Sequence, residues 1–326
     1  MRATQRAIMY VTLSIATLAT AVSCGSSDRD AGAETAPLSV EHRFGAAEII
    51  GQPQRVVALS SQWLDALLAL DVQPVAYLED PLAGDDGLYV WQHPHIGDAD
   101  AITASDTGLP LERIAAAEPD LILADYSAGE QQVYDQLNAI APTIGMLGDE
   151  QVDPWDKQLR VIGEILGKTA QADEIIDRVN NEITAIASEL PELAGKTAVL
   201  SQFMFDSDQI VAVADPEDGA STLFYALGMA LPDHLVTEAA GTGRLIVSPE
   251  RVDILRSDLL ITWPNGGDPE ELMQIPGFSD LPSVQGGGFA AVDIETVIAL
   301  NTPSALSTEW VLSSLRPQLE CVSGRC

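Results

Sequence analysis

The sequence predicts an α/β protein of two lobes with mostly parallel sheets, joined by one long α-helix. Segments typical of strands alternate with segments typical of helices up to residue 154, and the alternation resumes after residue 191. Between them, apolar residues recur at steps of three and four from Ala170 to Leu190, which is the spacing of one helix face. The chain of 326 residues is long enough for two lobes of ordinary domain size.

Residues 1–23 have the pattern of a secretory signal peptide. Two arginines give a positive start, and a stretch of apolar and small residues up to Val22 comes next without an acidic residue. The stretch resembles a bacterial lipobox before Cys24, although Ala21 stands where leucine is usual. We expect cleavage before Cys24 and lipidation of its thiol; ordinary cleavage that leaves a free thiol is the alternative.

Residues 24–40 are mostly polar and small, which is typical of a flexible tether between an anchor and a folded domain. Two or three acyl chains would hold such a tether stably in a bilayer. The expected location is therefore extracytoplasmic, on the outer face of the bacterial cytoplasmic membrane.

The first lobe is predicted over residues 41–154, and its alternation of strands and helices is Rossmann-like. The run Leu121-Ile-Leu-Ala124 is apolar throughout, as a parallel strand covered on both faces should be. The predicted strands are residues 55–60, 74–78, 120–125 and 143–147, and the predicted helices are residues 62–70, 111–117 and 129–140.

The linking segment is predicted over residues 155–190. A first amphipathic run begins at Trp155, and the long helix comes after the break at Gly167. Thr169 is expected to cap this helix and Pro191 to end it.

The second lobe, residues 191–326, repeats the Rossmann-like pattern. Its last residues include Cys321 and Cys326, which should form a disulfide in an oxidising compartment. A metal site there is the alternative, and it would need two more ligands. The predicted strands are residues 196–203, 209–213, 259–262 and 289–293, and the predicted helices are residues 220–227, 249–255 and 303–315.

One motif occurs in both lobes. The segment Leu111–Ala124 matches Pro249–Thr262 in its Glu-Arg pair, in an aspartate before the strand and in the apolar positions after it. This similarity favours two related lobes on either side of the long helix. Chance or convergence is the alternative, because a short helix that leads to a buried strand is a common unit.

Composition and motifs disfavour several functions. With 49 acidic and 16 basic residues the net charge is −33, which would repel nucleic acid. The phosphate-binding, nucleophile-elbow and zinc-protease motifs are missing, and there are four histidines in all. His93 and His95 could bind a metal or haem, but no third ligand is evident, and a surface loop is the simpler interpretation. We therefore expect a binding protein without enzymatic activity, cofactor or protein-bound metal.

Candidate ligand-binding residues come after the predicted strands, since open α/β lobes bind ligands at the carboxyl ends of their strands. Aromatic residues gather at these ends, although the chain is only 5% aromatic. They suit a large, flat or metal-complexed ligand; ordinary packing within the lobes is the alternative for some of them. Arg244 could pair with an anionic ligand group, or it could be a plain surface arginine. The candidates are Trp63, Tyr89, Trp91, Tyr126, Phe203, Phe205, Arg244 and Trp263.

Six segments after Cys24 carry a family resemblance: they are Pro53–Ser60, Asp65–Val75, Leu111–Leu123, Leu137–Thr143, Gly163–Ala172 and Val247–Val252. Together they resemble the substrate-binding lipoproteins of ferric-siderophore and cobalamin ABC importers. The resemblance covers nearly the whole chain after Cys24. It implies two lobes joined by one long helix, and a monomeric receptor that delivers a ferric siderophore to an ABC permease, with the iron carried inside the ligand. A haem or cobalamin receptor, or a cell-surface enzyme or accessory subunit, is the alternative.

The resemblance also implies that one glutamate on each lobe pairs with arginines of the permease. These glutamates fall at Glu112 and Glu250, within the repeated motif. A carboxylate at a helix start is also favoured by the helix dipole, which would explain either one without docking. The strong acidity further suggests a neutral or cationic ligand, or a locally basic cleft around Arg244. A single connecting helix should allow only a small closure on the ligand.

Overall fold

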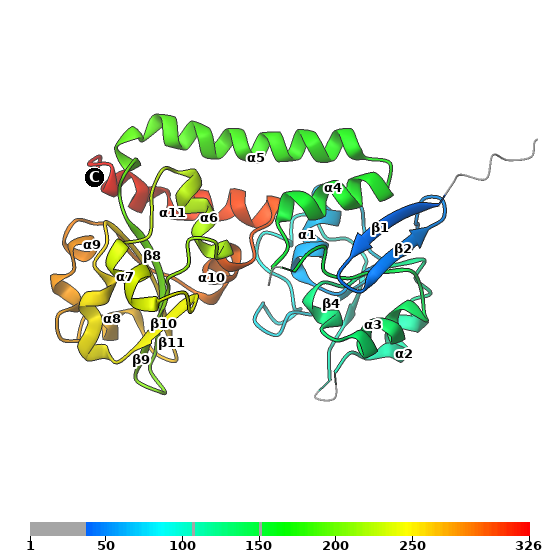
Figure 1. The fold of residues 1–326 in the computed structure, drawn as a ribbon, viewed down its shortest axis with the longest axis horizontal. Coiled ribbons are helices and arrows are strands. Elements are labelled where there is room, and N and C mark those ends of the chain that lie inside the picture. The colour runs from blue at the N-terminus through cyan, green and yellow to red at the C-terminus, as the bar shows by residue number, and fades with distance from the viewer. Residues whose placement is uncertain (1–36, 106–107, 150–151) are drawn as a thin grey trace, which may run out of the picture. The chain divides into compact units, whose positions relative to one another are not determined.

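The computed structural model describes residues 37–105, 108–149 and 152–326, which belong to one compact unit. The predicted signal peptide, Cys24 and most of the predicted tether lie outside these residues. Figure 1 shows two α/β lobes side by side along a layer of long helices. The predicted fold class is confirmed. Within the described ranges, no helix is both long enough and apolar enough to span a membrane.

The described chain begins with an antiparallel hairpin of β1 (Leu38–His42) and β2 (Gly45–Ile49). Gly45 has a φ of +130° at the turn, a conformation that favours glycine. The hairpin corrects the predicted tether, because β1 begins before residue 40. Val40 and His42 are buried, whereas their neighbours in β1 are exposed. This alternation is typical of a strand that has one face on the core.

The first lobe contains a sheet in the order β5-β4-β3-β6-β7, with all neighbouring strands parallel. Asp120 fixes the start of β3 by accepting hydrogen bonds from the backbone N–H groups of Gln54 and Arg55, both at 2.8 Å. The elements are β3 (Val56–Ala58), β4 (Ala76–Leu78), β5 (Asp100–Ile102), β6 (Leu121–Leu123), β7 (Thr143–Ile144), α1 (Ser61–Ala69), α2 (Leu111–Ala116), α3 (Gln131–Asn138) and the 3₁₀ turn η1 (Tyr126–Ala128).

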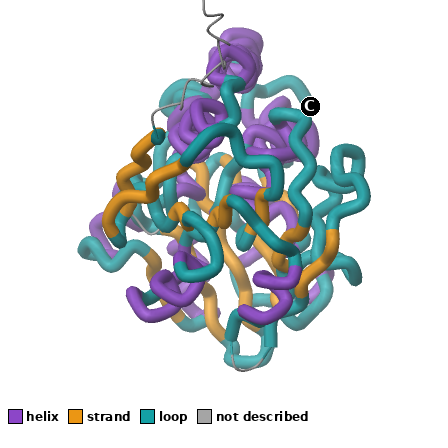
Figure 2. Tube along the Cα trace, turned by 90° about the vertical axis from the view of Figure 1, so that its right-hand side faces the viewer, coloured by secondary structure: helices purple, strands orange, loops and turns teal. Residues whose placement is uncertain are grey.

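Three helices form the layer that joins the lobes: α4 (Trp155–Ile165), α5 (Thr169–Glu189) and α11 (Ala305–Val322). In Figure 2 helices gather at one end of the molecule, above the strands. The helix α5 has 21 residues and buries the predicted apolar face. Its predicted cap is wrong: Thr169 is already helical, and Lys168 occupies the cap position without a side-chain cap bond. The closing helix α11 packs on α5 and also on α1 of the first lobe, so the two lobes are joined by α5 and are also in contact through α11.

The sheet of the second lobe has the order β10-β9-β8-β11-β12. The pairs β8–β11 and β11–β12 are parallel, whereas β8–β9 and β9–β10 are antiparallel. The segment predicted as a helix at residues 249–255 is a 3₁₀ segment. It is kinked at Arg251, whose backbone φ and ψ are not helical. The elements are β8 (Ala198–Met204), β9 (Gln209–Val213), β10 (Arg244–Val247), β11 (Leu259–Asn265), β12 (Phe289–Ala291), α6 (Gly219–Ala226), α7 (Asp233–Ala239), α8 (Pro269–Leu272), α9 (Pro282–Gln285), α10 (Ile294–Asn301), η2 (Pro191–Leu193), η3 (Pro249–Leu255) and η4 (Phe278–Asp280).

One continuous apolar core runs from the first lobe through the helical layer into the second. It includes Trp63 and Leu67 of α1, Ile176 of α5, and Leu200 and Leu259 of the second sheet. Each Å² of apolar surface that is removed from water stabilises the folded state by about 25 cal/mol. A core shared in this way resists separation of the lobes.

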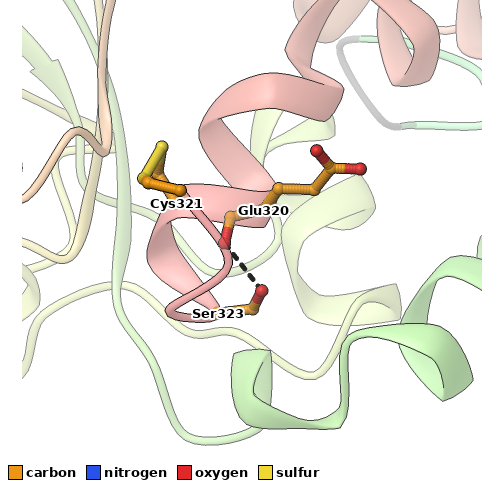
Figure 3. The surroundings of a disulfide bond; sticks show 4 residues. Glu320, Cys321 and Ser323 are labelled. Carbon is orange, nitrogen blue, oxygen red and sulfur yellow. Dashed lines mark hydrogen bonds between the residues drawn. A yellow bond between two sulfur atoms is a disulfide. The ribbon is translucent and has the colours of Figure 1, made fainter.

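The predicted disulfide between Cys321 and Cys326 is confirmed, and its Cα atoms are 4.5 Å apart. It lies at the end of α11, where the Ser323 hydroxyl donates a hydrogen bond to the Glu320 carbonyl (Figure 3). It packs against Gly287, whose φ is +76° and where an added Cβ would lie 3.2 Å from the Cys321 sulfur. The disulfide therefore packs the end of the chain against the turn before β12.

Candidate functional site

Two cavities of about 300 and 190 Å³ form a crevice between the lobes. The larger cavity is bounded by residues that come after β3, β4 and β6 of the first lobe, together with Ile298 and Thr302 of the second. The smaller one is lined by β8, β9, β10 and β11, and by the same Ile298 on α10. Because Ile298 lines both cavities, they adjoin across α10. We call the pair the crevice.

The wall of the crevice in the first lobe carries a carboxylate in a fixed position. Asp80 accepts a hydrogen bond from the Ser61 hydroxyl at 3.0 Å and another from the backbone N–H of Leu82 at 2.9 Å. Tyr126 also lines the larger cavity, with about half of its surface (51%) exposed. Burial, aided by the charges of Asp125 and Asp80, raises the pKa of the Tyr126 hydroxyl. Tyr126 thus presents a neutral phenol to the crevice at physiological pH.

Asp125 lies behind this wall and is 3% exposed. Its carboxylate accepts the backbone N–H of Ser127 at 3.4 Å, at the start of η1. Burial raises the pKa of Asp125 to about 7, against the effect of hydrogen bonds from Ser60 and Ser127. This carboxyl therefore changes protonation near neutral pH.

The wall of the crevice in the second lobe contains Trp263, Val211, Val213 and Arg244. The Arg244 guanidinium donates to the Asp218 carboxylate at 3.1 Å and to the Asn301 side-chain oxygen at 3.0 Å. The same Asp218 carboxylate caps α6 by accepting the N–H of Ala220 at 2.9 Å. The one arginine among the described residues that line the crevice is therefore already paired within the protein.

Of the eight predicted ligand-binding residues, Tyr126, Arg244 and Trp263 line the crevice. Trp63 does not: its neighbours Ser61 and Gln62 face the larger cavity, whereas the helical turn directs Trp63 into the core, where it is 0% exposed. Its assignment to the ligand site is corrected.

Tyr89 and Trp91 are also corrected, since both are buried. Their rings stack at 4.7 Å between centroids and 7° between planes. The Trp91 indole N–H donates to Asp65 at 2.9 Å. Both residues thus hold the long loop after β4 against the core.

Phe203 is buried in the core of the second lobe and the partly buried Phe205 packs against that core, with their ring centroids 4.6 Å apart. Along β8 successive side chains alternate between faces, so Gln202 reaches the crevice and Phe203 points to the other side. The sequence-based prediction named Phe203, whereas its polar neighbour Gln202 lines the cavity. The position of Asp80 after the strand 74–78 was a usable signal, whereas nothing in the sequence indicated Ile298.

A buried polar network connects the lobes beside the crevice. The Asp65 carboxylate, 2% exposed, accepts hydrogen bonds from Gln92 at 2.6 Å, from Trp91 and from the hydroxyl of Ser304, which caps α11. The Gln62 amide donates to the Pro303 carbonyl at 2.8 Å. Burial raises the pKa of Asp65 to about 6, although these hydrogen bonds lower it.

The two glutamates of the repeated motif are exposed. Glu112 lies in the first turn of α2 and Glu250 in the first turn of η3. Their neighbouring arginines are engaged internally: Arg113 donates to the Ala101 carbonyl at 3.2 Å, and Arg251 pairs with Glu238 through two hydrogen bonds. Within the described part of the chain, neither glutamate carboxylate makes a hydrogen bond or an ion pair.

The histidine loop shows no metal site. The His93 Nε2 atom lies 3.1 Å from a carboxylate oxygen of Asp86, and this contact lowers the pKa of the Asp86 carboxyl. Over residues 37–105, 108–149 and 152–326, no group of three or more His, Cys, Asp and Glu side chains could hold a metal ion.

A ligand-sized crevice between two α/β lobes, at the carboxyl ends of parallel strands, defines the class of two-lobed solute-binding proteins. The chain belongs to the periplasmic binding protein family, whose model matches residues 56–295. The family is one of binding proteins, which points away from enzymatic activity.

Known proteins share this fold and sequence pattern. The "Probable siderophore-binding lipoprotein YfiY" of Bacillus subtilis is 25% identical over 203 residues, 57% of either chain. The "Fe(3+)-citrate-binding protein YfmC" of the same species is 28% identical over 280 residues, 84% of this chain and 85% of the relative. A crystal structure of a periplasmic solute-binding protein from Mycobacterium smegmatis has a TM-score of 0.76 at 28% identity, covering 88% of this chain and 99% of that one. Alignment with the first relative thus spans little more than half of its length.

Proposed function

We propose that this protein is an extracytoplasmic receptor that captures a ferric-siderophore complex and delivers it to an ABC permease. The observation that carries the proposal is the crevice, whose two adjoining cavities each contain an aromatic side chain, Tyr126 from the first lobe and Trp263 from the second. The names of the relatives, siderophore-binding and Fe(3+)-citrate-binding, support the ligand class.

In this proposal the iron arrives inside its chelator, and the protein supplies shape and contacts only. Aromatic rings and aliphatic side chains such as Ile298 and Val213 pack against the organic shell of the complex. The neutral Tyr126 phenol donates a hydrogen bond to a ligand oxygen. The protein performs no reaction on the ligand and needs no cofactor.

We also propose lipidation at Cys24 as the means of retention at the membrane, and Glu112 and Glu250 as the contacts with the permease. The two carboxylates are exposed, and one is provided by each lobe. Cations of a partner could therefore reach both.

Fluorescence titration tests the ligand assignment. A ferric complex in the crevice should quench Trp263, while the core residue Trp63 provides an emission that responds less. Titration of the wild type with ferric siderophores should quench at micromolar or lower concentration, and Trp263→Phe should lose most of that signal with little loss of affinity. Binding of haem or cobalamin in place of every ferric siderophore would reassign the ligand, and binding of none of them would reject the receptor function.

A further inference from the structure

The charged groups that line the crevice are unevenly balanced. Among the described lining residues, Glu79, Asp80 and Arg244 have formally charged side chains. The Asp218 carboxylate is in contact with Arg244, so that arginine contributes no net charge to the crevice. The remaining pair, Glu79 and Asp80, leaves the crevice with an excess of two negative charges. The Debye length at physiological ionic strength is about 8 Å, so salt screens this excess only partly for a ligand bound in direct contact with the wall.

Hydrogen bonds within the protein, as well as the charge of Asp218, keep Arg244 from binding a ligand. It donates to Asp218 and to Asn301, and Asp218 is in turn engaged as the cap of α6. An anionic ligand that recruited Arg244 would have to displace both acceptors and leave Asp218 partly buried without its cation. The guanidinium is therefore a poor receptor for an anion in this arrangement.

Asp80 is held toward the cavity instead. The hydroxyl of Ser61 and the backbone N–H of Leu82 fix its two oxygens. Tyr126 lies near enough for the Asp80 charge to raise the pKa of its phenol. A carboxylate that lines the same cavity as an aromatic ring is suited to an ammonium group or another cationic part of a ligand.

From these contacts we propose that the crevice selects ferric complexes of neutral or positive net charge, such as ferric tris-hydroxamates, over anionic ones, with Asp80 facing the ligand cation and Asp218 withholding Arg244 from anions. This selectivity rests on the proposed function as a ferric-siderophore receptor. It names the charge class of the ligand and two residues that set it.

The test compares three ferric probes of different charge by tryptophan quenching and by calorimetry. They are ferrioxamine B, a monocationic tris-hydroxamate; ferrichrome, a neutral tris-hydroxamate; and ferric enterobactin, a trianionic tris-catecholate. We expect one or both hydroxamate complexes to bind at least about 100-fold more tightly than the catecholate complex, and the preference to shrink as salt is added.

Two isosteric variants test the assigned residues, and a third serves as control. Asp80→Asn should weaken binding of the cationic probe about tenfold and leave the neutral one nearly unchanged. Asp218→Asn keeps a capping side chain and should strengthen binding of the trianionic probe, because Arg244 becomes available. Asp177→Asn, on the exposed face of α5 outside the crevice, removes the same charge and should change none of the three affinities. Thermal unfolding shows whether each variant is folded.

The results separate the two proposals. Tighter binding of the trianionic probe than of both hydroxamates would overturn the charge selectivity while the receptor function stands. Equal loss of the cationic and neutral probes in Asp80→Asn would overturn the role of Asp80. Failure of all three probes, and of other ferric complexes, would overturn the receptor function and with it this inference.

Discussion

Asp65 in the first lobe accepts a hydrogen bond from Ser304, the residue that caps the closing helix α11 of the second lobe. The two residues are 239 positions apart in the chain. Trp91 and Gln92 donate to the same carboxylate, so the contact is enclosed on several sides. A buried hydrogen bond therefore connects the two lobes beside the crevice, in addition to the helix α5.

Removal of this contact should loosen the lobes. We expect Ser304→Ala to lower the free energy of unfolding by about 2 kcal/mol, since it deletes a helix cap and a buried hydrogen bond to a carboxylate. Urea denaturation measures the change. Ser314→Ala serves as the control, because this exposed serine of the same helix bonds only to its own backbone turn at Trp310. Equal losses in the two variants would contradict a special role for Ser304.

Ligand binding should change the overall dimensions only slightly. The continuous core and the Asp65–Ser304 contact both oppose a wide opening, as does the internally hydrogen-bonded helix α5. Small-angle scattering with and without the ligand should give nearly the same radius of gyration in the wild type. A large decrease on binding would show that the lobes separate freely without the ligand.

Stability should depend on the protonation of Asp125. Its pKa is raised from 3.8 to about 7 in the folded state, so the fold favours the protonated carboxyl. The native state binds more protons than the unfolded state between these values, and this group therefore makes stability fall as the pH rises from about 4 to 7. Asp125→Asn should flatten this part of the pH profile and stabilise the protein at pH 8 by about 2 kcal/mol.

Chemical denaturation across that pH range measures the effect of Asp125→Asn. Asp135→Asn, an exposed change on α3, is the matched control and should leave the profile unchanged. Identical slopes for the wild type and Asp125→Asn would contradict the assignment.

Docking to the permease should depend on Glu112 and Glu250 together. The double variant Glu112→Ala and Glu250→Ala should abolish uptake of the ligand into cells while ligand affinity stays within about twofold of the wild type, since neither side chain lines the crevice. A matched double variant, Glu164→Ala with Glu174→Ala, removes two exposed acids from the helical layer and should keep uptake. Uptake that survives the first double variant would remove the docking assignment.

The disulfide should stabilise the end of the chain modestly. A closed loop of six residues contributes about 2 kcal/mol in the chain-entropy model. Replacement of both Cys321 and Cys326 by serine should lower the free energy of unfolding by no more than this amount and leave ligand affinity unchanged, because the bridge packs on Gly287 outside the crevice. A strong loss of affinity would show that the bridge supports the crevice.

Local sequence patterns were enough to predict the fold class, the position of α5 and the Cys321–Cys326 pair. These features depend on local periodicity and on a short loop, which neighbouring residues specify. The sequence also placed Tyr126 and Trp263 after predicted strands, where parallel strands direct residues into a crevice. Arg244 reaches the crevice differently, as the first residue of the antiparallel strand β10.

Which strand-end residues line the crevice depends on how the whole chain packs. Trp63 and Gln62 are adjacent in sequence, yet one is core and the other lines the cavity, because a helix rotates successive side chains by about 100°. The pairing of Arg244 with Asp218 and Asn301 joins segments far apart in the chain, so no local pattern could show that this cation is already neutralised. That long-range contact decides the charge of the crevice and, in our proposal, the charge of the ligand.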